Sequence, residues 1–470
     1  MPATHRSCMI TICKPAKIRH RAPHSPRMRT LMILWRFERW LCVALLLMAC
    51  LTPTDAALAE PNPPTFKPLE YEIQLDTVLR NEDGDFIWYH PRTTPIPIAG
   101  QNAGPVVLLT LQKHLRASDH FSQLYAMHTS DLGQTWSQPN APAELAWVPE
   151  AGNVNVGVAD VTLAYHIPTG KVVAVGARVR YSRDGQELAD RPRSNQTAYA
   201  VYDPKTREWS RWCTLEMPAG EAFNFARSAC AQSVVKQDGT LLLPFYFGHS
   251  NTGPWKVTIA QCSFDGDELK YLRHGDEMDL PESRGLSEPS LIYYGDRYFL
   301  TIRHDLRGYV TSGDDQLHFA PLTTWQFDDD SDLGSYNTQQ HWLAHSDGLF
   351  LVYTRRGANN DLIERHRAPL FIAQIDPIRL RVVRSTERVL IPERGAEMGN
   401  FGATAVNSQQ SWVTVSEGIF DEKAGPGRVS GATILARILW STPNRLATTT
   451  DDREESVAKG FSRKLSTDTN

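Results

Sequence analysis

The feature that most constrains the fold is a hairpin pattern that recurs six times between residues 68 and 440. Each copy has an apolar β-rich run, a polar turn and a second β-rich run, which is typical of a β-hairpin. The turns lie at residues 98–104, 167–171, 236–240, 293–297, 345–349 and 407–411. Six hairpins at intervals of roughly 50 to 70 residues predict an all-β, six-bladed β-propeller with about four strands in each blade.

Two other architectures fit the sequence less well. No long amphipathic helical pattern separates the hairpins, which argues against a doubly wound α/β fold. A pair of β-sandwiches is the remaining alternative, although sandwiches would not naturally give six similar units. With 41% hydrophobic and 22% charged residues, the chain can bury a sizeable core. We therefore predict a propeller domain over residues 60–445, followed by a polar, disordered tail over 446–470.

The N-terminal segment is typical of an export signal. An apolar run at residues 41–51 follows Arg36 and Arg39 and precedes a small-residue cleavage site at 57–60. This arrangement predicts a leader over residues 1–59 and a periplasmic or extracellular protein. A buried N-terminal helix is the alternative. No later stretch approaches the roughly 20 apolar residues that a membrane span needs.

The leader leaves two points open. Residues 1–27 are basic and unpatterned, so translation starting at Met28 or Met32 is an alternative. The segment that ends at Cys50 resembles a bacterial lipobox, which would leave a lipid anchor on that residue.

Charge and cysteine content restrict the partners. Residues 1–60 carry nine basic and three acidic residues, whereas the remainder carries 40 basic and 50 acidic residues. The acidic body argues against binding nucleic acid. After the leader, Cys213, Cys230 and Cys262 remain without a CxxC spacing, which permits one disulfide but suggests no zinc site. We expect no metal ion or organic cofactor, because no His/Cys/Asp cluster shows ligand spacing, and we expect a monomer.

One turn carries a recognisable motif. The segment HTSDLGQTW has the spacing S/T-x-D-x-G-x-T-W, formed by Thr129, Asp131, Gly133, Thr135 and Trp136. The aspartate can accept backbone N–H bonds, the glycine can supply a positive φ, and the tryptophan can fill space between strands. The segment resembles the Asp-box, or BNR repeat, of the sialidase (neuraminidase) superfamily. The motif therefore predicts a folding role rather than a chemical one.

The resemblance to sialidases extends to the candidate site and covers nearly the whole propeller. The segment HPRTTPIP is similar to the family's Arg-x-Pro motif, which implies that Arg92 binds a substrate carboxylate. The stretch before the Asp-box is similar to the family segment that carries the acid/base aspartate, which implies this role for Asp119, with Arg116 beside the pocket. The segment around Asp160 resembles the one that supplies a substrate-contacting aspartate. A solvated carboxylate at a strand end is the alternative for Asp160.

The hairpin LSEPSLIYYGDRYFLTIR gives the strongest match. Glu288 precedes its first strand and Arg303 ends its second. Two strands of about six residues around a short turn place both residues at the same end of adjacent strands, where both can face the central cavity. The family's glutamate and second arginine show this arrangement.

The last two hairpins complete the implied set. The strand end at Arg355 and Arg356 corresponds to the third arginine, and only one of the two can point inward because side chains alternate along a strand. We choose Arg355. Glu417 lies where the family has a carboxylate that holds the first arginine. Three arginines suit a carboxylate because guanidinium groups bind it through paired, charge-assisted hydrogen bonds. Three unrelated ion-pair arginines are the alternative.

The sequence departs from the family at the nucleophile. The family's tyrosine should fall near Phe401 or Gly402, neither of which has a hydroxyl group, and Tyr336 is a candidate only if the register of the last two blades differs. The resemblance implies an exo-acting glycoside hydrolase that releases sialic acid or a related acidic sugar from glycoconjugates, with Asp119, Glu288 and Glu417 in the catalytic set. The missing tyrosine leaves two alternatives open: a non-catalytic glycan-binding propeller, and a hydrolase of another carboxylated sugar.

Overall fold

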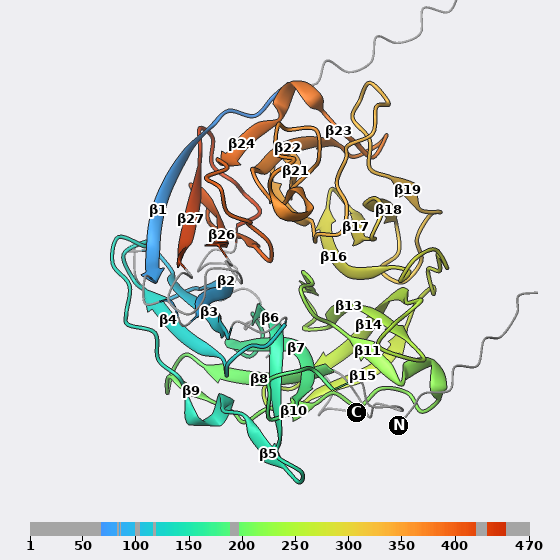
Figure 1. Cartoon of the computed structure of the whole chain (residues 1–470). Helices are drawn as coiled ribbons and strands as arrows, with labels where there is room; N and C mark the ends of the chain where they lie inside the picture. Colours follow the sequence, from blue (N-terminus) through green and yellow to red (C-terminus); the bar gives the residue numbers. More distant parts are fainter. Residues whose placement is uncertain are drawn as a thin grey trace, which may run out of the picture. The chain divides into compact units, whose positions relative to one another are not determined.

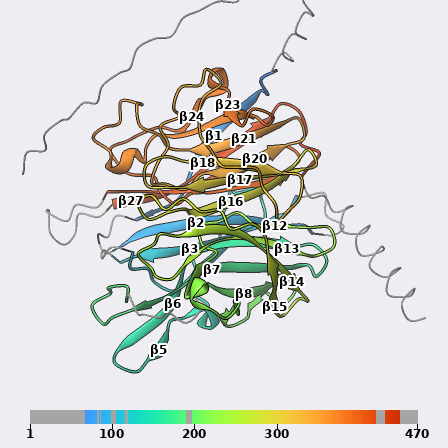
Figure 2. The same ribbon diagram turned by 90° about the vertical axis from the view of Figure 1, so that its right-hand side faces the viewer.

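The computed structural model describes residues 67–81, 84, 86–98, 104–115, 119–188, 197–419 and 430–447. The predicted leader, with Cys50, and nearly all of the predicted tail lie outside these residues, as does Arg116. Within the described part, six antiparallel sheets surround a common centre like the blades of a propeller (Figure 1). Seen from the side, the strands lie in successive sheets (Figure 2). The predicted all-β, six-bladed β-propeller is confirmed.

The first three blades follow one another along the chain. Blade 1 contains β2 (Ile87–Ile96), β3 (Val106–His114) and β4 (Tyr125–Thr129). Blade 2 contains β5 (Val148–Glu150), β6 (Val154–His166), β7 (Lys171–Tyr181), β8 (Thr197–Asp203), β9 (Glu208–Trp209) and β10 (Cys213–Thr214). Blade 3 contains β11 (Phe225–Arg227), β12 (Val234–Val235), β13 (Leu241–Gly248), β14 (Lys256–Phe264) and β15 (Leu269–His274).

The last three blades complete the ring. Blade 4 contains β16 (Ser287–Tyr294), β17 (Arg297–Arg303), β18 (Tyr309–Gly313) and β19 (Thr323–Thr324). Blade 5 contains β20 (His341–His345), β21 (Gly348–Tyr353), β22 (Leu370–Asp376), β23 (Arg381–Val382) and β24 (Arg388–Ile391). Blade 6 contains β25 (Gly402–Asn407), β26 (Gln410–Ile419), β27 (Ser430–Trp440) and β1 (Tyr71–Asn81).

Blade 6 joins the two ends of the propeller. The first strand, β1, pairs with the last, β27, from Tyr71 opposite Trp440 to Asn81 opposite Gly431. Around the centre, β2 contacts both β6 and β25, β12 contacts β6 and β16, and β20 contacts β16 and β25. The innermost strands therefore form a closed ring, which leaves only the outer strand of each blade as an edge.

All six predicted turns lie where the repeat pattern puts them. Each connects an innermost strand to the second strand of its blade: β2 to β3, β6 to β7, β12 to β13, β16 to β17, β20 to β21 and β25 to β26. Apolar residues on these inner strands pack between neighbouring blades. Trp325, Trp342 and Trp412 are among the largest fully buried side chains of the described residues.

The helices in the described part are four short 3₁₀ turns: η1 (Ala143–Leu145), η2 (Glu221–Phe223), η3 (Glu364–His366) and η4 (Arg384–Thr386). None of the described helices has the length and apolar character that crossing a membrane requires. Cys213, Cys230 and Cys262 are all free thiols, so the permitted disulfide does not form among them.

The turn after β4 forms the contacts predicted for its motif. The Asp131 carboxylate accepts hydrogen bonds from the Thr135 backbone N–H (2.9 Å) and from the hydroxyl groups of Thr129 (2.7 Å) and Thr135 (2.5 Å). Gly133 has a φ of 79°. Trp136 packs against the buried cluster that contains Trp412. Hydrogen bonds from Thr135, first its hydroxyl and then its backbone N–H, lower the pKa of Asp131 to about 2.

Asp131→Ala is expected to lower the melting temperature near neutral pH without changing the chemistry of the pocket. Because the pKa of Asp131 in the folded state is about 2, below its ordinary value of 3.8, its contribution is present above that ordinary value and is lost as the pH falls towards 2. The difference in melting temperature between wild type and variant should therefore disappear across this interval. Asp184→Ala, at an exposed turn position, is the control. Equal melting temperatures at neutral pH would contradict the folding role.

Candidate active site

The inner ring carries six polar residues in the left-handed backbone conformation, one for each blade. Their φ angles lie between 43° and 59°, and they are His90, Asp160, Cys230, Glu288, Asn337 and Asn400. In β2, β6 and β16 the pairing register shifts beside this residue, as it does at a β-bulge. Such backbone is strained for residues other than glycine and is concentrated at functional sites. The fold therefore presents one polar side chain from each blade around the centre.

A pocket of about 530 Å³ lies over this ring. All six blades, or the loops next to them, contribute residues to its lining. Its walls combine carboxylates and arginines with aromatic rings, including Tyr89, Tyr246 and Trp255. A pocket of this size lies within the range of small-molecule binding sites.

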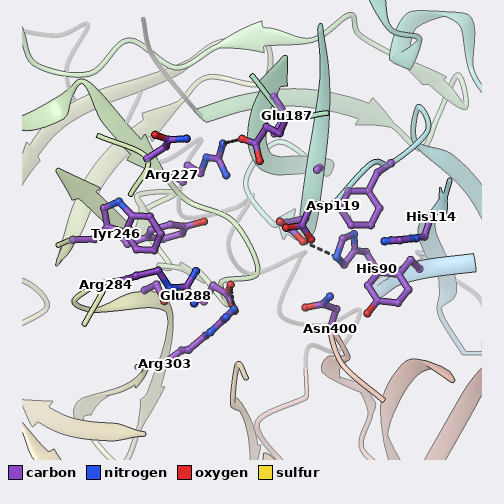
Figure 3. Close-up of a pocket in the computed structure, with 18 of the residues that line it drawn as sticks. His90, His114, Asp119, Glu187, Arg227, Tyr246, Arg284, Glu288, Arg303 and Asn400 are labelled. Carbon is purple, nitrogen blue, oxygen red and sulfur yellow. Dashed lines mark hydrogen bonds and ion pairs between the residues drawn. The ribbon is translucent and has the colours of Figure 1, made fainter. Parts of the chain in front are cut away.

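Asp119 lies in the loop after β3 and projects into the pocket near His90 (Figure 3). Its side chain is exposed to the cavity but enclosed by the pocket walls. This partial burial raises the pKa of Asp119, and the negative charges of Asp160 and Glu187 raise it further. A carboxyl group with a raised pKa can hold a proton and donate it.

Glu288 and Arg303 meet in the pocket, as the hairpin spacing predicts. Ser287 on β16 is paired with Arg303 on β17, so both site residues lie at the same end of adjacent strands. The Glu288 carboxylate accepts a hydrogen bond from Arg303 Nη1, and Arg303 Nη2 donates to Asn337 Oδ1 at 2.6 Å. Although burial opposes it, the charge of Glu288 raises the pKa of Arg303. Figure 3 shows this pair across the pocket from Asp119.

Asp160 also lines the pocket, where its carboxylate contacts two other members of the ring. Its Oδ1 lies 2.6 Å from His90 Nε2 and 3.1 Å from Cys230 Sγ. Although burial opposes it, contact with His90 and then the hydrogen bond from Cys230 hold the pKa of Asp160 below its usual range. Asp160 is therefore a partly buried, ionised member of the pocket rather than a solvated strand end.

Arg92 does not lie where the resemblance implied. The register shift in β2 places His90 in the pocket, whereas Arg92 lines a separate cavity of about 490 Å³ between the inner strands. Its Nη1 donates to the backbone carbonyls of Pro91 and Asn400. The bulge at His90 changes the face on which the following residues lie, so Arg92 points away from the pocket.

Arg355 and Glu417 also lie outside the pocket lining, contrary to prediction. Arg355 forms a double hydrogen bond with Glu387, at 2.8 Å for both Nε and Nη2, and stacks on Phe371. Glu417 forms the same kind of pair with Arg394, at 2.9 Å for both nitrogens, and does not contact Arg92. Arg355 follows the end of β21 by two residues and Glu417 lies within β26, and each side chain forms its ion pair outside the pocket lining.

The positions predicted for a nucleophilic tyrosine hold no hydroxyl group. Phe401 is fully buried against His341. At Gly402, an added Cβ would meet Arg92 Cδ at 2.8 Å, so a larger residue would collide with that side chain. Tyr336 forms a hydrogen bond with His366 Nδ1 at 2.6 Å and is not part of the pocket lining.

Two arginines that sequence reasoning missed join Arg303 on one wall of the pocket. Arg284, Arg303 and Arg367 all donate to Asn337: Arg284 to Oδ1 at 3.4 Å, Arg303 to Oδ1 at 2.6 Å and Arg367 to the backbone carbonyl at 3.2 Å. Arg284 precedes β16 and Arg367 precedes β22, so neither lies at the inner-hairpin strand ends that the repeat pattern identified.

Sequence reasoning also missed an ion pair on the wall next to this cluster. Arg227 on β11 is hydrogen-bonded to Glu187 at 2.5 Å, and both line the pocket (Figure 3). Although burial opposes it, the charge of Glu187 raises the pKa of Arg227. Glu187 follows β7 by several residues, so its pattern in the sequence did not distinguish it from an ordinary loop carboxylate.

No protein-family model matches the chain, and no curated protein is detectably similar to it in sequence. Solved structures of sialidases do match. A mutant of Trypanosoma rangeli sialidase displaying trans-sialidase activity gives a TM-score of 0.52 at 11% identity, over 79% of this chain and 59% of that one. The NanB sialidase from Streptococcus pneumoniae gives 0.53 at 10% identity, over 80% of this chain and 71% of that one.

A complex of Trypanosoma rangeli sialidase with the inhibitor DANA gives a TM-score of 0.51 at 12% identity. It covers 78% of this chain, and the match spans 59% of the solved chain. At such low identities the likeness concerns the fold. The protein has a six-bladed propeller of the kind found in sialidases and trans-sialidases.

Proposed function

We propose that the protein is an exported, periplasmic or extracellular, exo-acting glycoside hydrolase of sialidase type, which releases a terminal acidic sugar, sialic acid or a relative, from glycoconjugates. The observation that carries the proposal is the meeting of Arg284, Arg303 and Arg367 on one pocket wall, with Asp119 across the cavity. A sugar carboxylate bound to the arginines would turn the glycosidic bond towards Asp119.

The arginine cluster keeps donors available for an anion. The Arg284 side chain is 46% exposed and its guanidinium lies at the pocket. Arg367 Nη1 lies 3.9 Å from the nearest Glu397 oxygen, which is too far for a hydrogen bond. Glu288 and Glu397 offset part of the repulsion between the arginines, and an entering carboxylate would offset the rest. Guanidinium groups are suited to this task because they bind carboxylates through two parallel hydrogen bonds.

Asp119 supplies the proton in this proposal. As the glycosidic C–O bond breaks, the leaving oxygen accepts the Asp119 proton, while a water molecule ultimately supplies the hydroxyl group of the released sugar. The raised pKa of Asp119 suits this role because the group must be protonated before the reaction.

The pH profile provides a direct check on Asp119. Since the acid acts only when protonated, kcat/KM should fall as the pH rises through the pKa of Asp119. The midpoint of this fall should lie at a pH above 3.8, the ordinary pKa of an aspartate. Glu187→Gln should move the midpoint of this fall to lower pH, because the charge of Glu187 raises the pKa of Asp119. A midpoint that is unchanged in Glu187→Gln, or that moves to higher pH, would contradict the assignment of Asp119 as the proton donor.

A glycan-binding propeller without turnover is the second candidate. It is favoured by one observation: the positions expected for a nucleophilic tyrosine hold Phe401 and Gly402, and Glu288 is hydrogen-bonded to Arg303. A propeller that lacks the nucleophile can bind the sugar without cleaving it. A hydrolase of another carboxylated sugar remains the third candidate.

One assay separates the three candidates. The purified full-length protein is tested for release of a fluorophore from a sialoside and, in parallel, from a uronide. Release from the sialoside supports the proposal, whereas release from the uronide alone identifies a different acidic sugar. No release from either substrate, together with saturable binding of free sialic acid measured by calorimetry, would identify a glycan-binding module.

A further inference from the structure

Three side chains with metal-binding atoms meet at the base of the pocket, where His90 and Asp160 line the cavity and Cys230 is buried beside them. His90 Nε2, Asp160 Oδ1 and Cys230 Sγ all lie within 4.8 Å of one another. They come from blades 1, 2 and 3: His90 from β2, Asp160 from β6 and Cys230 from the segment between β11 and β12. No spacing rule in the sequence could bring them together, because 70 residues separate each from the next.

The backbone holds all three residues in a strained conformation. Their φ angles are 51° for His90, 56° for Asp160 and 53° for Cys230. Rigid surroundings fix the His90 ring further, since Tyr89 and Phe121 contact it at centroid distances of 4.9 Å and 4.5 Å. Ligands held in place in this way lose little freedom when they bind an ion.

Hydrogen bonding within the described residues does not satisfy the cluster. His90 is only 2% exposed; its Nε2 lies 2.6 Å from the Asp160 carboxylate, whereas its Nδ1 has no hydrogen-bond partner among the described residues. Cys230 contributes only a weak thiol donor to Asp160 at 3.1 Å. Buried polar atoms are normally well paired, so a cluster whose thiol has only a weak hydrogen bond is incompletely satisfied by the protein alone.

From these observations we propose that His90, Asp160 and Cys230 bind one divalent transition-metal ion, zinc being the best match. Imidazole nitrogen, carboxylate oxygen and thiolate sulfur are the three ligand types of protein zinc sites. Bonds of about 2.0–2.3 Å to one tetrahedral ion require ligand atoms a little over 3 Å apart, so His90 and Asp160 move slightly apart on binding.

The surroundings fit an ion at this position. Asn400 Oδ1 lies 4.0 Å from Cys230 Sγ and is a further oxygen beside the cluster. His90, Asp160 and Asn400 all line the pocket, so a fourth coordination position can face a water molecule or a substrate oxygen. Figure 3 shows His90 and Asn400 on the same side of the pocket.

Cobalt titration tests the site without any glycoside. The full-length protein is stripped with a chelator and titrated with Co²⁺, which gives a thiolate-to-cobalt absorption band when cysteine is a ligand. We expect a band that saturates at one equivalent and is displaced by Zn²⁺. Cys230→Ala should abolish this band, whereas Cys213→Ser, at an exposed free cysteine, should leave it unchanged and serves as the matched control.

Asp160→Asn provides the second variant, because it keeps the shape of the side chain and removes its charge. It should weaken Co²⁺ binding at least about 10-fold, the lower limit seen even for residues that only support metal ligands. Circular dichroism establishes that each variant is folded. A band that persists in Cys230→Ala, unchanged affinity in Asp160→Asn, or no cobalt–thiolate band in the wild type would overturn the proposal. None of these results depends on the proposed hydrolase activity.

Discussion

Replacing Asp119 by asparagine is expected to lower kcat for release of the acidic sugar by about 10²- to 10⁴-fold, the usual contribution of a general acid. Asparagine keeps the size of the side chain but has no proton to donate to the leaving oxygen. Ligand affinity should be retained, because the arginine cluster lies across the pocket and is unaffected. The measurement is kcat with the fluorogenic substrate, combined with calorimetric binding of the free sugar.

Glu150→Gln is the control for this experiment. Glu150 is also a partly exposed carboxylate, but it pairs with Arg178 and Arg180 and does not line the pocket. Its replacement should leave kcat unchanged. If Asp119→Asn retained wild-type kcat, another group would have to donate the proton. If neither the wild type nor the variant turned over substrate while both bound sugar, the binding-module alternative would be favoured.

Arg303→Met is expected to reduce the free energy of unfolding by about 3–5 kcal/mol, the usual cost of leaving one member of a buried ion pair without its partner. The pair qualifies as buried because the side chains of Arg303 and Glu288 are only 11% and 15% exposed. The variant should also lose affinity for the acidic sugar, since it removes one of the carboxylate-binding groups. Denaturant unfolding and calorimetry measure the two effects separately.

The double variant Glu288→Gln/Arg303→Met tests the cause of this loss. Without the Glu288 charge, the buried methionine faces a neutral amide, so much of the stability should return while sugar affinity stays low. Arg394→Met is the exposed control: Arg394 pairs with Glu417 but is 47% exposed, so its loss should cost at most about 1 kcal/mol. A double variant no more stable than Arg303→Met would show that packing, and not the unpaired charge, explains the loss.

Part of the pocket follows from local sequence patterns. Glu288 and Arg303 belong to one hairpin, and a hairpin with a short turn fixes which residues lie opposite each other. The turn contacts of Asp131 are equally local, since all its partners lie within four residues. Such contacts can be predicted because few residues, and no other blade, decide them.

Other site residues could not be placed in this way. Arg92 and His90 are two residues apart, yet they line different cavities, because a bulge in β2 lies between them. Arg367 lies near the end of the long connection between β21 and β22, and the path of that connection brings it to Asn337. Strand alternation predicts the face of a side chain only while the register is regular, and here it is interrupted at the centre of the propeller.

The sequence by itself determined the all-β class, the six blades and the Glu288–Arg303 hairpin, because periodic apolar runs and short turns act over a few residues. The tertiary structure alone decided which charged groups meet in the pocket: Arg284 and Arg367 in place of Arg92 and Arg355, and His90 beside Asp160 and Cys230. These choices depend on left-handed residues and bulges in the inner strands and on contacts between blades. Such contacts join residues far apart in the chain, so no local pattern encodes them.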